Sequence, residues 1–488
     1  METKSRKLIS FFSENIFSAR VLAFIIITLT AIISRFYISF SNDLFNGVDG
    51  GYYPLQVRSI LNDGHLVFYD VPLYFYFCAI VIKTASLFGL AITNETIILV
   101  IKIIDCIVLP LLAVPVLKLV SVKDRHIPLL SEISILLFVV FSFSPLIMLG
   151  DLQKNGFAVP FLFMFIYFFE NYLVTGQKRN LLFSILTLFI IALTHFGVFV
   201  FGMAFTIVSL FVVYKKKAIL PSVLTLLIGI AIISFFDFNR ALRLITFWNV
   251  IIEKPAMLQG PMPLLLLFNV LFSYLLVLFA MVQYRKNNHK VNGQMVLILV
   301  VLISIFAFPF FDLEYFHRFE ILLFIPQSLL ILNLIRMNKN LAIPFSTVLV
   351  LLAAFSISMN LREMKKPVID KLALQDLQNI IRYIPANRDS TIIIASHGLE
   401  FWTAWTLNVK VRNDRAFDKL VPEKYRNIII LQQKKEFMEK PLGKMPLPKP
   451  SGSKGGLPPI GQPMGRPVPE NFKLIYDSPY FIAFQNLN

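Results

Sequence analysis

Residues 20–58 read RVLAFIIITLTAIISRFYISFSNDLFNGVDGGYYPLQVR. The first half is a continuous apolar run, long enough to cross the ~30 Å hydrocarbon core of a bilayer. The second half turns acidic, glycine-rich and aromatic, and an amphipathic run follows it directly. A solvated connector would not need Gly-Gly-Tyr-Tyr beside an aspartate. The stretch therefore favours a membrane span followed by a functional loop over a span followed by a mere connector.

The composition extends this pattern to the whole chain of 488 residues, which is 57% hydrophobic, contains 49 Phe and is only 15% charged. A soluble fold cannot bury that much apolar surface, whereas a bilayer accommodates it. The sequence predicts a polytopic α-helical membrane protein with about 11–13 transmembrane helices, and the first apolar run is expected to be a retained span. The apolar segments fall near 18–40, 72–91, 95–120, 130–149, 156–174, 181–193, 195–213, 218–236, 263–283, 294–311, 319–336 and 341–359.

Charged residues in the connections orient these segments. Lys and Arg retain short loops in the cytoplasm, and such loops alternate with poorly basic ones from residue 121 to residue 359. Segment 72–91 breaks the alternation and carries Lys83 in its middle, so we expect it not to cross fully, which leaves eleven spans. This topology explains much of the net charge of +17 through contacts with membrane lipids, and no nucleic-acid partner is expected. The basic connections are Lys178-Arg179, Lys215-Lys216-Lys217, Arg285-Lys286 with Lys290, and Arg336 with Lys339.

Two domains follow from the change in composition after Asn360. Residues 1–359 form the membrane domain, and residues 360–488 are expected to form a small external α/β domain. Helical spacing covers Leu374–Tyr383, and strand-like runs follow it. A stretch rich in Pro, Gly and Lys at 441–469 predicts a flexible insert that does not pack. The expected strands are Thr391–Ala395, Leu407–Val411, Asn427–Leu431, Phe472–Tyr476 and Tyr480–Phe484.

Familiar catalytic motifs are missing from the sequence. Cys78 and Cys106 both lie in apolar segments, so they form neither a disulfide framework nor a zinc cluster. The chain has no P-loop, no Gly-x-Gly-x-x-Gly, no His-Glu-x-x-His and no Gly-x-Ser-x-Gly. Without a nucleotide-binding motif, an energy source would have to arrive with the substrate or from the membrane.

Four polar groups fall at the expected external ends of the apolar segments. Each has a simpler interpretation: a solvated connector for the Asp49 loop, an interfacial ion pair for Asp151 with Lys154, a helix cap for His195, and snorkelling to lipid headgroups for Arg318. Together they favour a pocket at the external membrane surface. A partly desolvated carboxylate suits a general base or a divalent-metal ligand, and basic side chains suit a phosphate. The groups are Asp49 with Arg58, Asp151–Asn155, Thr194-His195, and Asp312–Arg318.

At these residues the chain resembles the GT-C superfamily of integral-membrane glycosyltransferases, which use polyprenyl-phosphate-linked sugars at the external face of the membrane. The resemblance covers about residues 20–340. It depends on the Asp49–Tyr53 loop, on Asp70–Tyr74 and on Asp151–Asn155. Gly398–Trp402, after the first strand of the external domain, is also similar to some members.

The resemblance implies roles for individual residues. Asp49 would act as the base or orient the acceptor, Asp151 would assist it or bind metal, and Arg318 would hold the donor phosphate. The stretch Asp151–Asn155 lacks the paired acids of oligosaccharyltransferase members. A Mg or Mn ion is therefore an open expectation; if one is used, Asp49 and Asp151 would be its ligands. The expected substrate-binding residues are Arg58, Tyr52, Tyr53, Lys154, Asn155, His195, His317 and Arg318.

The function predicted from these features is sugar transfer from a polyprenyl-phosphate-linked donor to a glycan, lipid or protein acceptor. The reaction is expected at the external face of a membrane, with a bacterial inner (plasma) membrane as the expected location. One alternative is a transporter or flippase of lipid-linked saccharides, which predicts inverted repeats and broken mid-membrane helices that the sequence does not show. The other is a non-catalytic membrane protein of envelope assembly.

Overall fold

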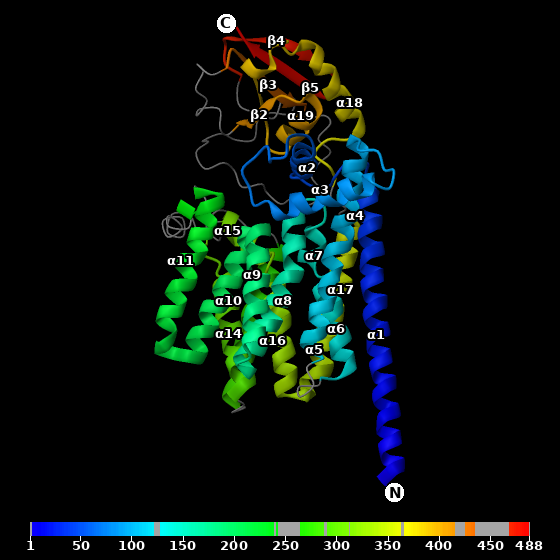
Figure 1. Cartoon of the computed structure of the whole chain (residues 1–488), viewed down its shortest axis with the longest axis vertical. Helices are drawn as coiled ribbons and strands as arrows, with labels where there is room; N and C mark the ends of the chain where they lie inside the picture. The colour runs from blue at the N-terminus through cyan, green and yellow to red at the C-terminus, as the bar shows by residue number, and fades with distance from the viewer. Residues whose placement is uncertain are drawn as a thin grey trace.

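The computed structural model describes residues 2–121, 127–238, 241–242, 264–286, 290–311, 313–362, 366–414, 425–434 and 468–487. A bundle of long helices carries a small domain with a β-sheet at one end (Figure 1). The N-terminus of α1 lies at the opposite end of the molecule from this domain (Figure 1). The helices of the bundle and its end are α1 (Glu2–Phe40), α2 (Tyr52–Asp63), α3 (Leu73–Ser86), α4 (Asn94–Val108), α5 (Ala113–Val120), α6 (Leu129–Phe141), α7 (Phe143–Ile147), α8 (Gln153–Thr175), α9 (Lys178–Thr194), α10 (Phe196–Tyr214), α11 (Ile219–Phe236), α13 (Leu264–Lys286), α14 (Lys290–Phe306), α15 (Leu313–Glu320), α16 (Phe324–Met337) and α17 (Ala342–Arg362).

The membrane part matches the hydropathy of the sequence. In the described chain, eight helical segments are long and apolar enough to cross a membrane. One of them, Phe196–Phe236, contains both α10 and α11, which pack against each other and are joined by the short helix η2 (Lys215–Ala218). Helices α9 and α14 have 17 residues each, the lower limit for a span. The predicted multi-pass helical architecture is confirmed. The eight segments are Ala19–Phe40, Asn94–Val120, Leu129–Ile147, Gln153–Thr175, Phe196–Phe236, Leu267–Lys286, Phe316–Met337 and Lys339–Met359.

Helices α2 and α3 lie at the end of the bundle, below the sheet (Figure 1). With 14 residues, α3 is about 21 Å long at 1.5 Å per residue, which is too short for the hydrocarbon core. Segment 72–91 therefore does not form a membrane-length helix. Helix α2 is amphipathic; it packs against α3 and α4 and also against α19 (Leu399–Leu407) of the small domain.

The small domain contains a five-stranded sheet with the strand order β2-β1-β3-β5-β4. Strand β1 pairs in parallel with β2 and β3, whereas β5 pairs antiparallel with β3 and β4. All five residues of β1 are buried, as its unbroken apolar run predicts. The remaining elements are α18 (Lys371–Asn379), η5 (Ile380–Tyr383), β1 (Thr391–Ala395), β2 (Lys410–Asn413), β3 (Asn427–Gln433), β4 (Phe472–Asp477) and β5 (Phe481–Asn486).

One expected strand is wrong in its position. Leu407 is the last residue of α19, and the strand predicted at 407–411 begins only at Lys410. The reason is local: Asn408 adopts a left-handed conformation with φ +50°, which ends the helix and turns the chain into β2. The insert expected at 441–469 lies, except for its last two residues, outside the described residues.

The basic turns of the bundle lie together. The turn between α10 and α11, which holds Lys215–Lys217, and the turn between α16 and α17, which holds Lys339, are both at the end away from the sheet (Figure 1). These two basic turns therefore lie at the same end of the bundle, away from the α/β domain, in agreement with the alternation of basic loops.

Candidate active site

Two aspartates that are 102 positions apart in the sequence meet at the end of the bundle below the sheet. The backbone N–H of Asp49, in the loop between α1 and α2, donates a hydrogen bond of 2.8 Å to Oδ1 of Asp151. The hydroxyl of Tyr53 donates to the backbone oxygen of Asp151 at 3.1 Å. The structure thus brings together Asp49, Asp151 and Tyr53, three of the residues that the sequence predicts for the site.

Two glycines allow this close approach. Gly47 has φ +88°, and a Cβ on it would lie 2.4 Å from Cγ of Asp151. Gly150 has φ +82°, and a Cβ on it would lie 2.7 Å from the backbone oxygen of Asn46. Only glycine adopts such angles without strain and leaves this space. The loop sequence therefore determines that the two aspartates can be neighbours.

A buried ion pair supports the Asp151 loop from within the bundle. Oδ2 of Asp105 accepts a hydrogen bond of 2.7 Å from the N–H of Gly150. Arg35 of α1 lies 3.3 Å from Oδ1 of Asp105 and also donates to the backbone oxygen of Pro145 at 2.8 Å. Both charged side chains are almost completely buried. Each compensates the charge of the other, because an unpaired buried charge is strongly unfavourable. The Asp151 loop is thereby tied to α1 and α4.

Lys154 lies on the first turn of α8, next to Asp151, and is engaged in a second buried pair. Its Nζ contacts the carboxylate of Asp70, which also accepts a 2.5 Å hydrogen bond from the hydroxyl of Tyr52. The ammonium group lies over the rings of Tyr52 and Phe75, at 5.6 and 5.4 Å from their centroids. Asp70 and these rings thus hold Lys154 beside the carboxylates.

A histidine from the small domain completes the surroundings of Asp49. Nε2 of His397 lies 3.6 Å from Oδ1 of Asp49, and its Nδ1 lies 3.2 Å from Oε1 of Glu400. Oε2 of Glu400 accepts a 2.5 Å hydrogen bond from Nδ2 of Asn413. His397 follows β1, Glu400 lies in the first turn of α19, and Asn413 ends β2. The three come together because the carboxyl ends of parallel strands lie at one edge of the sheet.

The sequence interpretation did not select His397, Glu400 or Asn413. A signal was nevertheless present: a histidine and a glutamate directly follow the predicted strand Thr391–Ala395, and polar residues at the carboxyl end of a buried parallel strand commonly contribute to sites. That pattern does not predict that His397 contacts Asp49, because Asp49 belongs to the other domain.

The environment of Asp49 changes its acidity. The side chain is 36% exposed, yet burial by the surrounding protein raises its pKa to about 6, and the charge of Asp151 adds to this effect. His397 and Lys154 lower the pKa, and Glu400 raises it slightly. A carboxylate with a pKa near neutral is suited to act as a general base, because it is mostly ionised at pH 7 and still accepts a proton readily.

Arg58 and His195, two expected substrate-binding residues, have structural partners. Nη1 and Nη2 of Arg58 donate to the backbone oxygens of Trp405 (2.6 Å) and Ala404 (3.3 Å), respectively, and its guanidinium lies 4.2 Å from the centroid of the Trp405 ring. His195 caps α10, with its Nδ1 accepting a hydrogen bond from the N–H of Val198 at 3.2 Å. The structure therefore accounts for both side chains without a substrate.

The remaining predicted residues lie on two helices. Asn155 follows Lys154 on α8 and is partly exposed. His317 and Arg318 belong to α15, at the end of the bundle that carries the small domain (Figure 1). Nδ1 of His317 is 3.9 Å from Oε2 of Glu320, and Arg318 is exposed. Asp312, from the same expected group, is outside the described residues.

The sequence expects Asp49 and Asp151 to be the ligands of a metal ion if one is used. Within the ranges that the structure describes, no three His, Cys, Asp or Glu side chains are grouped so as to hold a metal ion. One oxygen of Asp151 is already used by the N–H of Asp49. The use of Asp49 and Asp151 as metal ligands stays a prediction of the sequence.

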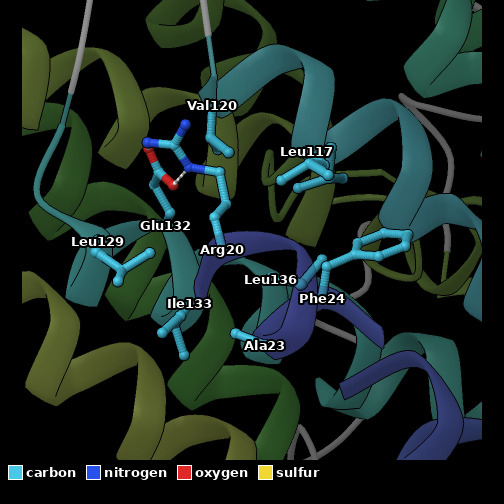
Figure 2. Close-up of a pocket in the computed structure, with 10 residues that line it drawn as sticks. Arg20, Ala23, Phe24, Leu117, Val120, Leu129, Glu132, Ile133 and Leu136 are labelled. Atoms are coloured by element: carbon cyan, nitrogen blue, oxygen red, sulfur yellow. Dashed lines mark hydrogen bonds and ion pairs between the residues drawn. The ribbon is translucent and has the colours of Figure 1, made fainter. Parts of the chain in front are cut away.

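A pocket lies near the other end of the bundle. Arg20, Phe24, Leu117, Glu132 and Leu136 are among its lining residues. Figure 2 shows the guanidinium of Arg20 turned toward the carboxylate of Glu132, with which it makes hydrogen bonds of 2.5 and 2.9 Å. Arg20 precedes the end of α1 by 20 residues, about 30 Å along the helix. The pocket is thus remote from Asp49, and its ion pair joins α1 to α6.

Comparisons with known proteins place the fold. No family model matches the chain, and no curated protein matches it. Among solved structures, the fold is similar to that of the Archaeoglobus fulgidus oligosaccharyltransferase in its apo form. The TM-score is 0.56 and the sequence identity 12%, and the match covers 83% of this chain and 69% of that one. The predicted architecture, a helical membrane bundle with a small C-terminal α/β domain, is confirmed, and its fold is similar to that of this oligosaccharyltransferase.

Proposed function

We propose that this protein is a membrane glycosyltransferase that transfers a sugar from a polyprenyl-phosphate-linked donor to an acceptor hydroxyl or amide. The observation that carries the proposal is the Asp49–Asp151 pair, joined by a 2.8 Å hydrogen bond at one end of a GT-C-like bundle. The pKa of the Asp49 carboxylate is about 6, and the pair lies at the end of the membrane helices. A lipid-linked substrate would present its reacting group at this depth.

Asp49 is the base in this proposal. Its carboxylate accepts the proton of the acceptor while the acceptor atom forms a bond to the anomeric carbon. The bond between that carbon and the phosphate oxygen breaks in the same step, the electron pair leaves with the phosphate, and the configuration inverts. Asp151 holds the Asp49 loop in place through the hydrogen bond to its N–H. The partly desolvated site strengthens these interactions.

The donor phosphate requires a cation, and Arg318 is our candidate. It is exposed on α15, at the same end of the bundle as the carboxylates (Figure 1). A guanidinium group binds phosphate oxygens through two parallel hydrogen bonds. Lys154 contributes at a distance: its pair with Asp70 leaves it close enough to lower the pKa of Asp49, which favours the ionised base.

The proposed reaction takes place at the external face of the membrane. The basic turns that hold Lys215–Lys217 and Lys339 lie at the end of the bundle opposite the sheet (Figure 1), and basic loops are retained in the cytoplasm. The carboxylates and the α/β domain would then face the exterior of a bacterial inner membrane.

The test is a transfer assay with the full chain in lipid nanodiscs. A panel of polyprenyl-phosphate monosaccharides with radiolabelled sugars is the probe, and release of polyprenyl phosphate together with labelled acceptor is the readout. We expect transfer by the wild-type protein and a loss of transfer in Asp49→Asn. Movement of intact lipid-linked sugar across liposomes, without cleavage of the sugar–phosphate bond, would instead establish a flippase and overturn the proposal.

A further inference from the structure

His397 of the small domain faces the carboxylate that we propose as the base. Its Nε2 lies 3.6 Å from Oδ1 of Asp49, an ion-pair distance. The other ring nitrogen, Nδ1, lies 3.2 Å from Oε1 of Glu400. Because a carboxylate only accepts hydrogen bonds, Nδ1 carries the proton of that bond. The imidazole is thereby oriented with Nε2 toward Asp49.

Glu400 is itself fixed. It is 7% exposed, and its second oxygen accepts a 2.5 Å hydrogen bond from Nδ2 of Asn413. A chain of four side chains, Asp49, His397, Glu400 and Asn413, thus runs from the membrane domain to the carboxyl ends of β1 and β2. A third group that orients a histidine facing an acid–base residue is a recurrent arrangement in enzymes.

The turn that carries His397 packs closely against the membrane domain. Gly398 has φ +91°, and a Cβ on it would lie 3.0 Å from the backbone oxygen of Val48. A Cβ on Gly51 would lie 2.9 Å from the ring of Trp402. The N–H of Gly47 also donates to the backbone oxygen of Lys366 at 3.1 Å. The segments before and after Asp49 are therefore packed against the small domain, and the distance from His397 to Asp49 is set by backbone contacts.

We propose that His397 is a positioning residue for Asp49 and that the small α/β domain thereby completes the active site of the membrane domain. This inference rests on the proposed function. His397 limits rotation of the Asp49 carboxylate and, when both ring nitrogens carry a proton, places a positive charge beside it. The other charged groups that face Asp49 are Asp151 and Lys154 from the bundle and Glu400 from α19. Of these, Asp151 and Glu400 oppose ionisation of Asp49, so His397 and Lys154 keep it available as a base.

The inference makes the small domain necessary for turnover. A domain that served only to bind the acceptor would affect the acceptor KM, whereas a domain that orients the base affects kcat. Glu400 and Asn413 would act through His397, so their substitution should give smaller losses in the same direction.

The experiment measures kcat, KM and the pH profile of transfer for His397→Ala, His397→Gln and Glu400→Gln in the full chain. The matched control is His65→Ala, since His65 is an exposed histidine whose Nδ1 lies 3.3 Å from the backbone oxygen of the adjacent Leu66. We expect His397→Ala to lower kcat about 10–100-fold, less than the 10²–10⁴-fold of a general base, with the donor KM within about twofold. The acid limb of its profile should move to higher pH. His397→Gln should recover part of kcat, because its amide N–H can occupy the position of the imidazole beside Asp49.

The outcomes separate the two proposals. Near-normal kcat in His397→Ala, while Asp49→Asn is inactive, overturns this inference and leaves the proposed function intact. A loss of kcat in His397→Ala that His397→Gln does not relieve, with an unshifted pH profile and a lowered thermal midpoint, shows a purely structural histidine and also overturns it. Absence of transfer by the wild-type protein overturns the proposed function and this inference together.

Discussion

Asp49 combines three properties at a single residue: a backbone N–H bound to Asp151, a partly exposed carboxylate, and a histidine at ion-pair distance. A base contributes about 10²–10⁴-fold to a reaction rate. We therefore expect Asp49→Asn to lower sugar transfer by at least that order while donor binding and expression stay near wild type. Asp63→Asn is the matched control, since Asp63 is an exposed aspartate at the end of α2. Near-normal transfer by both Asp49→Asn and Asp151→Asn would contradict the mechanism.

The acidity of the same residue predicts a pH dependence. The base must be ionised, and burial together with Asp151 raises the pKa of Asp49 to about 6. As the pH falls below this value, the protonated fraction grows and the transfer rate should fall about tenfold per pH unit. Initial rates between pH 4.5 and 8, at saturating donor, measure this limb. A profile that stays flat down to pH 4.5 would show that Asp49 keeps its ordinary pKa of about 3.8 or is not the base.

At the scale of elements, the contact between α2 and α19 joins the two domains. Arg58 donates to two backbone oxygens in the last turn of α19 and lies over the Trp405 ring. A cation is favourable at a helix C-terminus, and hydrogen bonds from a charged donor contribute about 1.5–3 kcal/mol. We expect Arg58→Met to lower the thermal midpoint of the protein in detergent and to reduce kcat, because the small domain carries His397.

Arg382→Met serves as the control for Arg58→Met, since Arg382 is an exposed arginine of the small domain. It should leave the thermal midpoint unchanged. The sequence interpretation gives Arg58 a different role, that of a substrate-binding residue. An unchanged thermal midpoint with a large increase in donor KM would support that role against the structural one.

For the whole molecule, the separation of charge predicts the orientation in the membrane. The Lys215–Lys217 turn and the α/β domain lie at opposite ends of the bundle (Figure 1). We expect the Asp389→Cys variant to react with an impermeant maleimide on intact cells. The Lys216→Cys variant should react only after permeabilisation. Both sites are exposed, and the native Cys78 and Cys106 are buried, so background labelling should be low. Equal labelling at both sites in intact cells would contradict the topology.

The sequence by itself determined the properties that depend on short stretches of chain. The length of the apolar runs decides which segments can cross a bilayer. The alternating basic loops predicted which ends of the helices lie together, and the unbroken apolar run Thr391–Ala395 predicted the central strand β1 with the bounds that the structure shows. Asp49 and Asp151 were placed on the same side by this topology. These features are local, or follow from counting spans, and therefore need no knowledge of long-range packing.

The tertiary structure alone decided the partners of the polar side chains. Asp70 pairs with Lys154, Arg58 binds carbonyls 346 and 347 positions away, and His397 meets Asp49 from the other domain. None of these contacts leaves a periodic pattern in the sequence, because each depends on how the small domain packs on the loop between α1 and α2. The sequence determined that a carboxylate lies at the end of the bundle. The packing of the two domains decided which charges surround that carboxylate, and the surrounding charges and burial decide its acidity.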